Sequence, residues 1–127
     1  FLDVAAETGA ADFRAGMSVS WGDYNRDGWM DLYIGNMFSA AGNRIAFQHE
    51  FQTDGDDHER RLFQGRASGN SLYQNTGDHG SQEVSQTAAV AMGRWSWSSN
   101  FVDLNNDGWE DLVVGNGFYS HEDSADL

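Results

Sequence analysis

Residues 17–38 read MSVSWGDYNRDGWMDLYIGNMF, and residues 97–118 read WSSNFVDLNNDGWEDLVVGNGF. Aligned at an offset of 80 without gaps, the two stretches are identical at 11 of 22 positions. The match continues more weakly upstream, where residues 1–10 lie over residues 81–90 and Val4 aligns with Val84. Repeats on this scale are typical of propellers and solenoids, so the chain is predicted to hold about 1.6 copies of an 80-residue unit.

Short runs with the composition of β-strands recur within this unit. They alternate small polar with apolar residues, or are short apolar runs that end at Gly-Asn or in a turn cluster. These runs are residues 18–21, 31–35, 71–74 and 82–85, with residues 111–115 repeating the second. Four short strands in meander order describe a propeller blade. The sequence therefore predicts an all-β fold of β-propeller type, built from four-stranded antiparallel blades.

The strands amount to about one and a half blades plus a leading strand, which is a partial propeller. Residues 1–127 are predicted to form one repeat region with three parts. Residues 1–16 are the leading strand of a preceding blade and a linker, residues 17–87 are a complete blade, and residues 88–127 are a partial second blade.

Within the first blade, residues 37–69 are an insertion that contains the charged run Thr53–Arg61. The insertion is expected to be a solvated surface loop without a strong helix, apart from one or two turns at Asn43–Phe51. A functional loop or a weak extra cation site is the alternative.

The chain is strongly acidic, with 20 acidic residues, 7 basic residues and a formal net charge of −13. Nucleic acids and anionic membranes are polyanions, so this charge argues against both as partners and fits a protein that collects cations. No apolar run approaches the roughly 20 residues that span a bilayer. The chain has no cysteine and does not begin with methionine, and its first residues, Phe1–Val4, are expected to be a strand rather than a signal peptide. It is expected to be a mature product or an excerpt of a longer protein.

Two loops carry the candidate chemistry. Loop one (Asp23–Asp31) and loop two (Asp103–Asp111) both follow the pattern D-x-N-x-D-G-x-x-D. Calcium prefers six to eight oxygen ligands, and positions 1, 3, 5 and 9 supply short side-chain oxygens while position 7 offers a carbonyl. Glycine at position 6 permits the sharp turn. The sequence predicts two Ca²⁺ sites. Their ligands are Asp23, Asn25, Asp27, Trp29 and Asp31 in loop one, and Asp103, Asn105, Asp107, Trp109 and Asp111 in loop two.

An EF-hand opens in the same way but closes with glutamate at position 12. Position 12 is Ile34 or Val114 here, so the EF-hand is excluded and each loop must join two strands. A polar hairpin turn without metal is the alternative. It is disfavoured because both copies keep every polar position, and three close carboxylates repel one another without a cation.

Aromatic residues recur at equivalent positions. Trp29 aligns with Trp109, and Trp21 aligns with Phe101. We expect them to pack between blades, the alternative being an aromatic sugar platform assisted by Trp95 and Trp97. The four histidines are scattered without a nucleophile motif and are interpreted as surface residues. No catalytic residue is predicted, and the chain is not predicted to be an enzyme. The histidines are His49, His58, His79 and His121.

These residues resemble the FG-GAP/VCBS repeat family, the calcium-binding β-propeller blades of integrin α-subunit heads and bacterial secreted repeat proteins. The likeness rests on Gly16–Tyr24, on Gly35-Asn36 and on Asn70–Gly80, and covers most of the chain outside residues 39–68. Ser81 departs from it, because the family often has an aromatic residue there. The resemblance implies secreted or cell-surface blades, extracellular or periplasmic, that serve adhesion or ligand binding. It also implies that the Asp and Asn side chains of both loops bind Ca²⁺.

A closed propeller needs at least four blades, so this chain needs partners. Either it is part of a longer propeller, or copies assemble head to tail, the leading strand of one completing the half blade of the next. The expected function is a non-catalytic, calcium-dependent structural, adhesion or protein-interaction module. The alternatives are a glycan-binding module and the non-catalytic portion of a secreted polysaccharide-acting enzyme.

Overall fold

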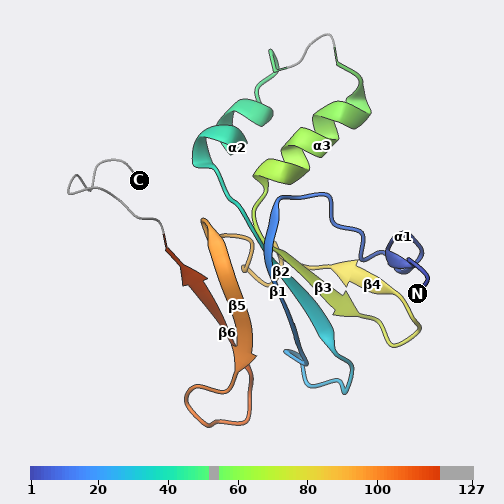
Figure 1. The fold of residues 1–127 in the computed structure, drawn as a ribbon, viewed down its shortest axis with the longest axis vertical. Helices are drawn as coiled ribbons and strands as arrows, with labels where there is room; N and C mark the ends of the chain where they lie inside the picture. Colours follow the sequence, from blue (N-terminus) through green and yellow to red (C-terminus); the bar gives the residue numbers. More distant parts are fainter. Residues whose placement is uncertain (52–54, 118–127) are drawn as a thin grey trace, which may run out of the picture.

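The computed structural model describes residues 1–51 and 55–117 (Figure 1). Thr53 and Asp54 of the charged run, and residues 118–127 of the expected second blade with His121, lie outside the described residues. The elements follow in the order α1 (Ala5–Thr8), β1 (Gly16–Gly22), β2 (Asp31–Asn36), α2 (Ala40–Ala46), α3 (Asp57–Ala67), β3 (Ser71–Asn75), β4 (Ser81–Glu83), β5 (Ser96–Val102) and β6 (Asp111–Asn116).

The strands form two antiparallel sheets. One has the order β1-β2-β3-β4 and the other is the pair β5-β6. All neighbours in the first sheet follow one another in the chain, which is the meander of a propeller blade. The prediction of an all-β fold with a four-stranded antiparallel blade and part of a second is confirmed.

The sequence repeat is also a repeat of strand register. Gly22 pairs with Asp31 in the first sheet, and Val102 pairs with Asp111 in the second. Each sheet has an irregularity at the start of its first strand, between Gly16 and Ser18 and between Ser96 and Ser98. Equivalent residues therefore point to equivalent faces of the two sheets, because side chains alternate along a strand.

The core lies between the two sheets. Tyr33, Leu72 and Phe101 form its buried centre. The rings of Tyr33 and Phe101 meet edge to face, with centroids 6.3 Å apart and planes at 82°, a favourable geometry for aromatic pairs. Two serine hydroxyls extend the contact, since Ser18 donates to the Ser96 carbonyl over 3.0 Å and Ser20 meets Ser99 over 3.3 Å. The second sheet thus packs on one face of the first, as neighbouring blades do.

The prediction of a leading strand at the N-terminus is wrong. Residues 5–8 form helix α1, which ends at Gly9 with φ of 76°. The same turn occurs one repeat later, since Thr8 N donates to Val4 O and Ala88 N donates to Val84 O, both over 2.9 Å. The weak sequence match of residues 1–10 with 81–90 therefore reflects a shared turn rather than a shared strand.

The expectation that residues 37–69 lack a strong helix is also wrong, because they contain α2 and α3. Asp56 caps α3 by accepting from Glu59 N over 2.7 Å, and Ser39 caps α2 in the same way through Gly42 N over 3.0 Å. Helix α3 buries Ala67 alone. A helix that buries so little needs no apolar stripe at helical spacing, so the sequence carried no such signal. The expected charged run lies partly inside this helix.

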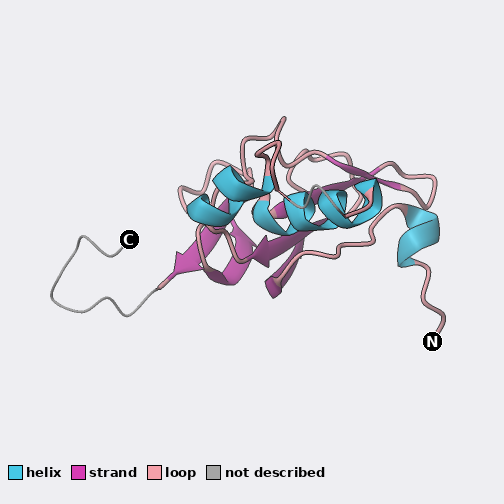
Figure 2. Cartoon of the chain, turned by 90° about the horizontal axis from the view of Figure 1, so that it is seen from above, coloured by secondary structure: helices cyan, strands magenta, loops and turns pink. Residues whose placement is uncertain are grey.

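The two helices form a hairpin at one end of the sheets (Figures 1 and 2). Both ends of the insertion are fixed to one segment, because Phe38 N donates to Arg94 O over 2.9 Å and Asn70 N donates to Ala91 O over 2.8 Å. The two ends of the insertion are therefore held close together, and β3 follows β2 in the sheet as it would without the hairpin. Among the described residues, no helix is long and apolar enough to cross a membrane.

Candidate metal centre

The two candidate loops lie at the same end of the molecule, opposite the helical hairpin (Figure 1). Loop one joins β1 to β2, and loop two joins β5 to β6. Both are strand–strand loops, as the apolar residues at position 12 required.

The backbones of the two loops have the same conformation. Position 4 has positive φ in both, 59° at Arg26 and 60° at Asn106. Position 6 has φ of 88° at Gly28 and 86° at Gly108. Glycine adopts such values without the cost that a Cβ imposes, which explains the glycine in both copies.

Side-chain oxygens of the first, third and fifth positions are turned into loop one. Asp23 accepts from Asp27 N over 3.0 Å and from Gly28 N over 2.9 Å. Asn25 accepts from Asp27 N over 3.1 Å, and Asp27 accepts from Trp29 N over 2.9 Å. Loop two repeats the same bonds at lengths of 2.7–3.0 Å. The loop amides thus fix the side chains that the sequence proposed as ligands.

Asp31, the closing residue of loop one, is fully buried at the start of β2. Its Oδ1 accepts from Asn75 N over 2.8 Å, whereas its Oδ2 is buried without a hydrogen-bond partner. Burial raises the pKa of Asp31, the Asn75 and Tyr24 amides oppose this, and the charges of Asp27 and Asp23 raise it further. A buried carboxylate oxygen without a hydrogen bond is costly, and the nearby Tyr24 amide offsets only part of that cost, since the pKa of Asp31 remains raised.

Asp111 closes loop two in a more open setting. It is only partly buried, and its Oδ2 accepts from Leu104 N over 3.1 Å. Asp107 is fully exposed, and hydrogen bonds from the Trp109 amide and the Asn105 side chain lower its pKa. The two loops therefore share one backbone but differ in the burial of the closing carboxylate.

The described side chains do not converge on one point. Across residues 1–51 and 55–117, no three His, Cys, Asp or Glu side chains lie close enough together to hold a metal ion. The donor set nevertheless fits a hard cation by its chemistry, because each loop offers three carboxylates and one amide oxygen, and loop one contributes the unpartnered Asp31 Oδ2.

Sequence reasoning missed a direct connection between the two loops. Glu110, at position 8 of loop two, accepts through Oε2 from Asp23 N of loop one over 2.9 Å. The guanidinium of Arg26 lies 4.9 Å from the centre of the Trp109 ring. The alignment does indicate that the two loops differ at this point, since position 8 is Met30 in loop one and Glu110 in loop two.

The tryptophans divide between the two expected roles. Trp109 contacts the neighbouring blade through Arg26, whereas Trp21 and Trp29 are 59% and 51% exposed. Trp95 and Trp97 lie 6.1 Å apart with ring planes at 43°. Packing between blades therefore holds at Phe101, which is 9% exposed, whereas Trp109 meets the first blade through Arg26 but is 49% exposed, close to its equivalent Trp29.

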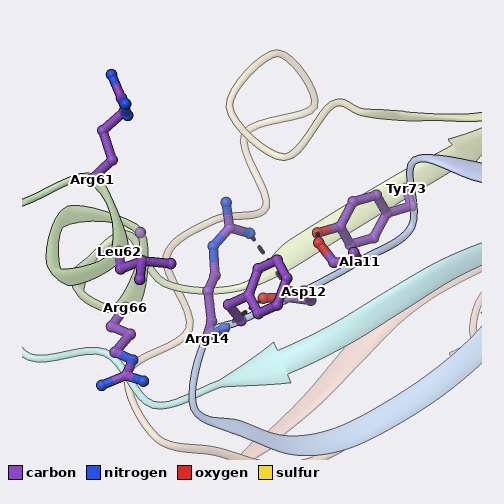
Figure 3. Close-up of a pocket in the computed structure, with 9 residues that line it drawn as sticks. Ala11, Asp12, Arg14, Arg61, Leu62, Arg66 and Tyr73 are labelled. Atoms are coloured by element: carbon purple, nitrogen blue, oxygen red, sulfur yellow. Dashed lines mark hydrogen bonds and ion pairs between the residues drawn. The ribbon is translucent and has the colours of Figure 1, made fainter. Parts of the chain in front are cut away.

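A small cavity of about 160 Å³ lies between α3 and the segment that precedes β1. Three arginines line it, but Figure 3 shows that Arg61 and Arg66 extend from α3 in opposite directions. Arg14 is engaged by Ser71, Asp12 and Glu83. The arginines do not converge on a common ligand, so the cavity is not a candidate anion site.

The histidines that the structure describes lie on the surface, as expected. His49, His58 and His79 are exposed, and none lines a loop of the candidate centre.

Comparison with known families matches this arrangement. The family model described as an FG-GAP repeat matches residues 15–46, and the model described as an FG-GAP-like repeat matches residues 53–114. A search among curated proteins and a search among solved structures gave no match. Both matched ranges contain part of a blade with its strand–strand loop, and the chain therefore carries repeats of the FG-GAP family.

Proposed function

We propose that this chain is a calcium-binding, non-catalytic structural or adhesion module of an extracellular or cell-surface protein. FG-GAP repeats are typically structural or interaction modules and are generally extracellular. Calcium binding, secretion and adhesion go beyond that family assignment and are the substance of the proposal.

The observation that carries the proposal is the Oδ2 atom of Asp31. It is buried without a partner, beside the charges of Asp27 and Asp23. Such an arrangement costs free energy in the metal-free chain. Ca²⁺, when bound, supplies the positive charge that offsets this cost.

In the proposed role the loop residues bind the cation and take no part in a reaction. Asp23, Asn25, Asp27 and Asp31 contribute side-chain oxygens, and Trp29 contributes its carbonyl. Loop two contributes the equivalent set Asp103, Asn105, Asp107, Trp109 and Asp111. A shell filled by protein oxygens leaves no open position to activate water. The two sites thus serve to fix the ends of neighbouring blades, with no catalytic step.

A partial propeller implies assembly with other blades. We propose that these blades come from a longer parent chain or from further copies, and that the assembled surface binds a protein ligand. Between the two sheets of this chain, such a contact is already formed by Tyr33 and Phe101.

Glycan binding is a second candidate, supported by one observation. Trp97 is 52% exposed, and its ring centroid lies 6.1 Å from that of Trp95, so about half of this residue is accessible to a sugar. A glycan array should give hits that W97A removes. An array without hits would leave the structural role as the better reading.

Calcium dependence is tested by thermal melting in millimolar Ca²⁺ and in EDTA. Free ligand at about 100 times Kd stabilises by about 2.7 kcal/mol per site, and a stabilisation of about 1 kcal/mol shifts the melting temperature of a domain of this size by roughly 3–6 °C. We therefore expect EDTA to lower the melting temperature by about 10 °C or more. Calorimetric titration should give two sites.

The matched variants are D31N and D111N, each of which should remove one site from the titration. D78N is the control, because Asp78 lies in an exposed turn and makes similar hydrogen bonds to Thr76 and Gly80 without belonging to either loop. A melting temperature unchanged by EDTA, or a D31N chain that still binds two ions, would overturn the proposal.

A further inference from the structure

The contact between the two sheets serves as a template for what must cover the open face of the first blade. The second blade contacts the first through Ser99, Phe101, Trp109 and Glu110. One repeat earlier, the equivalent residues are Val19, Trp21, Trp29 and Met30. Because the register is the same in both sheets, these four residues lie on the equivalent face of the first blade; we call it the open face.

The open face is apolar, and none of its four residues is packed against another blade among residues 1–51 and 55–117, although residues 8–11 lie along its β3–β4 side. Phe101 is 9% exposed, whereas its equivalent Trp21 is 59% exposed and Val19 is 61% exposed. A cavity of about 260 Å³ lies beside Trp21 and Met30 and extends toward Leu32 and Tyr73. Exposed apolar side chains gathered on one face mark an interaction site.

The contact between the two sheets also indicates which residue the partner must have opposite the aromatic ring. The phenyl ring of Phe101 lies directly over Gly22, the residue before the first loop aspartate. A Cβ built on Gly22 would lie 2.4 Å from Phe101 Cγ and 2.6 Å from Glu110 Oε2. No side chain fits at that position, so the contact between blades requires glycine there.

The second blade has Val102 where the first has Gly22. Valine places a Cβ and two methyl groups in the space that the aromatic ring of a following blade would need. A second copy of this chain would bring Trp21, which is larger than phenylalanine, to that point. Head-to-tail stacking of identical copies in the observed geometry is therefore blocked by sterics, which favours a longer parent chain over further copies as the source of the neighbouring blade.

We propose that the open face of Val19, Trp21, Trp29 and Met30 binds a further FG-GAP repeat that carries glycine before its first loop aspartate. The residue before the loop thus sets the order in which repeats can pack. An arginine at loop position 4 of that partner would cover Trp29, as Arg26 covers Trp109. The inference rests on the proposed role of the chain as one part of a propeller, and it names the partner.

The test makes the chain its own partner by removing the obstructing side chain. In calcium, V102G should associate with itself in a concentration-dependent way at micromolar concentrations in sedimentation velocity, because a glycine at position 102 leaves room for Trp21 of another copy. The parent chain and V102A should stay monomeric, since even a single Cβ collides with the ring. W21A in the V102G background should abolish the association.

Either of two results would overturn the proposal. One is a folded V102G chain that sediments as the parent does, and the other is a parent chain or V102A that associates as strongly as V102G. Persistent association of the W21A/V102G chain would assign the contact to another surface and would also count against it.

A second variant tests the glycine rule if V102G does not fold. G22V should lower the melting temperature by several degrees, and F101A should cost less in that background than in the parent. A G22V chain that melts as the parent does would refute the rule. Melting in calcium and in EDTA is recorded for the same samples, so that loss of calcium binding is distinguished from failure of the packing rule.

Discussion

At the scale of single residues, Asp31 couples burial to charge. Its carboxylate is fully buried, one oxygen accepts from the Asn75 amide, and the other has no partner. Burial of the charged form disfavours ionisation, and the neighbouring Asp27 and Asp23 act in the same direction on its pKa. In a metal-free chain the ionised Asp31 therefore lowers the stability of the fold at neutral pH. A bound cation would offset this cost at Asp31 more than at the other loop residues.

This cost has a defined dependence on pH. Because the pKa of Asp31 is raised in the folded state, the folded chain binds more protons than the unfolded chain between the unfolded and folded pKa values. The stability contributed by Asp31 therefore rises as pH falls through that window and is lost as pH rises again. In EDTA, D31N should melt higher than the parent at neutral pH, and the difference should shrink as the pH is lowered toward the folded pKa of Asp31.

Differential scanning of the two proteins at matched pH isolates this contribution, because other carboxylates such as Asp107, whose pKa is lowered, act equally in both. A D31N chain that melts below the parent in EDTA at neutral pH would show that Asp31 has a partner that stabilises its charge.

Both loops could be located from sequence alone, because their pattern fixes turn chemistry that is local in the chain. Gly28 and Gly108 occupy the left-handed conformations that the pattern required. The bond between Glu110 and the Asp23 amide could not be foreseen in this way. It joins residues of different repeats, and local patterns carry no information on which repeats are neighbours in space.

At the scale of elements, the strands were predictable and the helices were not. β1, β2 and β3 coincide with alternating or apolar runs in the sequence, because strand formation here is coupled to burial of one face. Helix α3 has the sequence DHERRLFQGRA and little apolar periodicity, and its N-terminal cap at Asp56 was the one local signal of a helix. The match of residues 1–10 with 81–90 predicts a leading strand, but a strand needs a neighbour to pair with, and residues 1–4 lack one among the described residues.

The helical hairpin should be dispensable for the blade. Both of its ends are held by the segment 91–94 through Phe38 N and Asn70 N, and its larger packing contact is between α2 and α3 themselves, through the Gln64 amide and the Ala46 carbonyl over 3.2 Å among others. Replacing residues 40–67 with a short Gly-Ser linker should leave the calcium-dependent shift in melting temperature within a few degrees of the parent value.

Far-ultraviolet circular dichroism should show loss of the helical signal with the β signal retained. The parent chain carrying D56A is the control, since loss of that cap weakens α3 by about 1 kcal/mol without shortening the chain. A linker variant that no longer melts cooperatively would show that the hairpin supports the sheet.

At the scale of the whole molecule, two blades are held at their loop ends by contacts that also join the two candidate metal sites. The Arg26 guanidinium lies over the Trp109 ring, next to the bond from Asp23 N to Glu110. The core contact of Tyr33 with Phe101 lies further along the same interface. The two loops are therefore joined directly by contacts between residues of different repeats.

This arrangement predicts a measurable coupling between residues 83 positions apart. In a double-mutant cycle of R26Q and W109A, an exposed cation–π contact should give an interaction free energy of roughly 0.5–1 kcal/mol in denaturant unfolding. Gln keeps much of the length of the side chain and removes its charge, so the cycle reports the contact with the ring. The control cycle pairs R26Q with W97A, whose ring contacts Trp95 in a tilted geometry instead, and should be additive. A coupling below about 0.3 kcal/mol, within the usual error of additivity, would mean that the contact of Arg26 with Trp109 does not form in solution, and the expectation that an arginine of the partner covers Trp29 would lose its template.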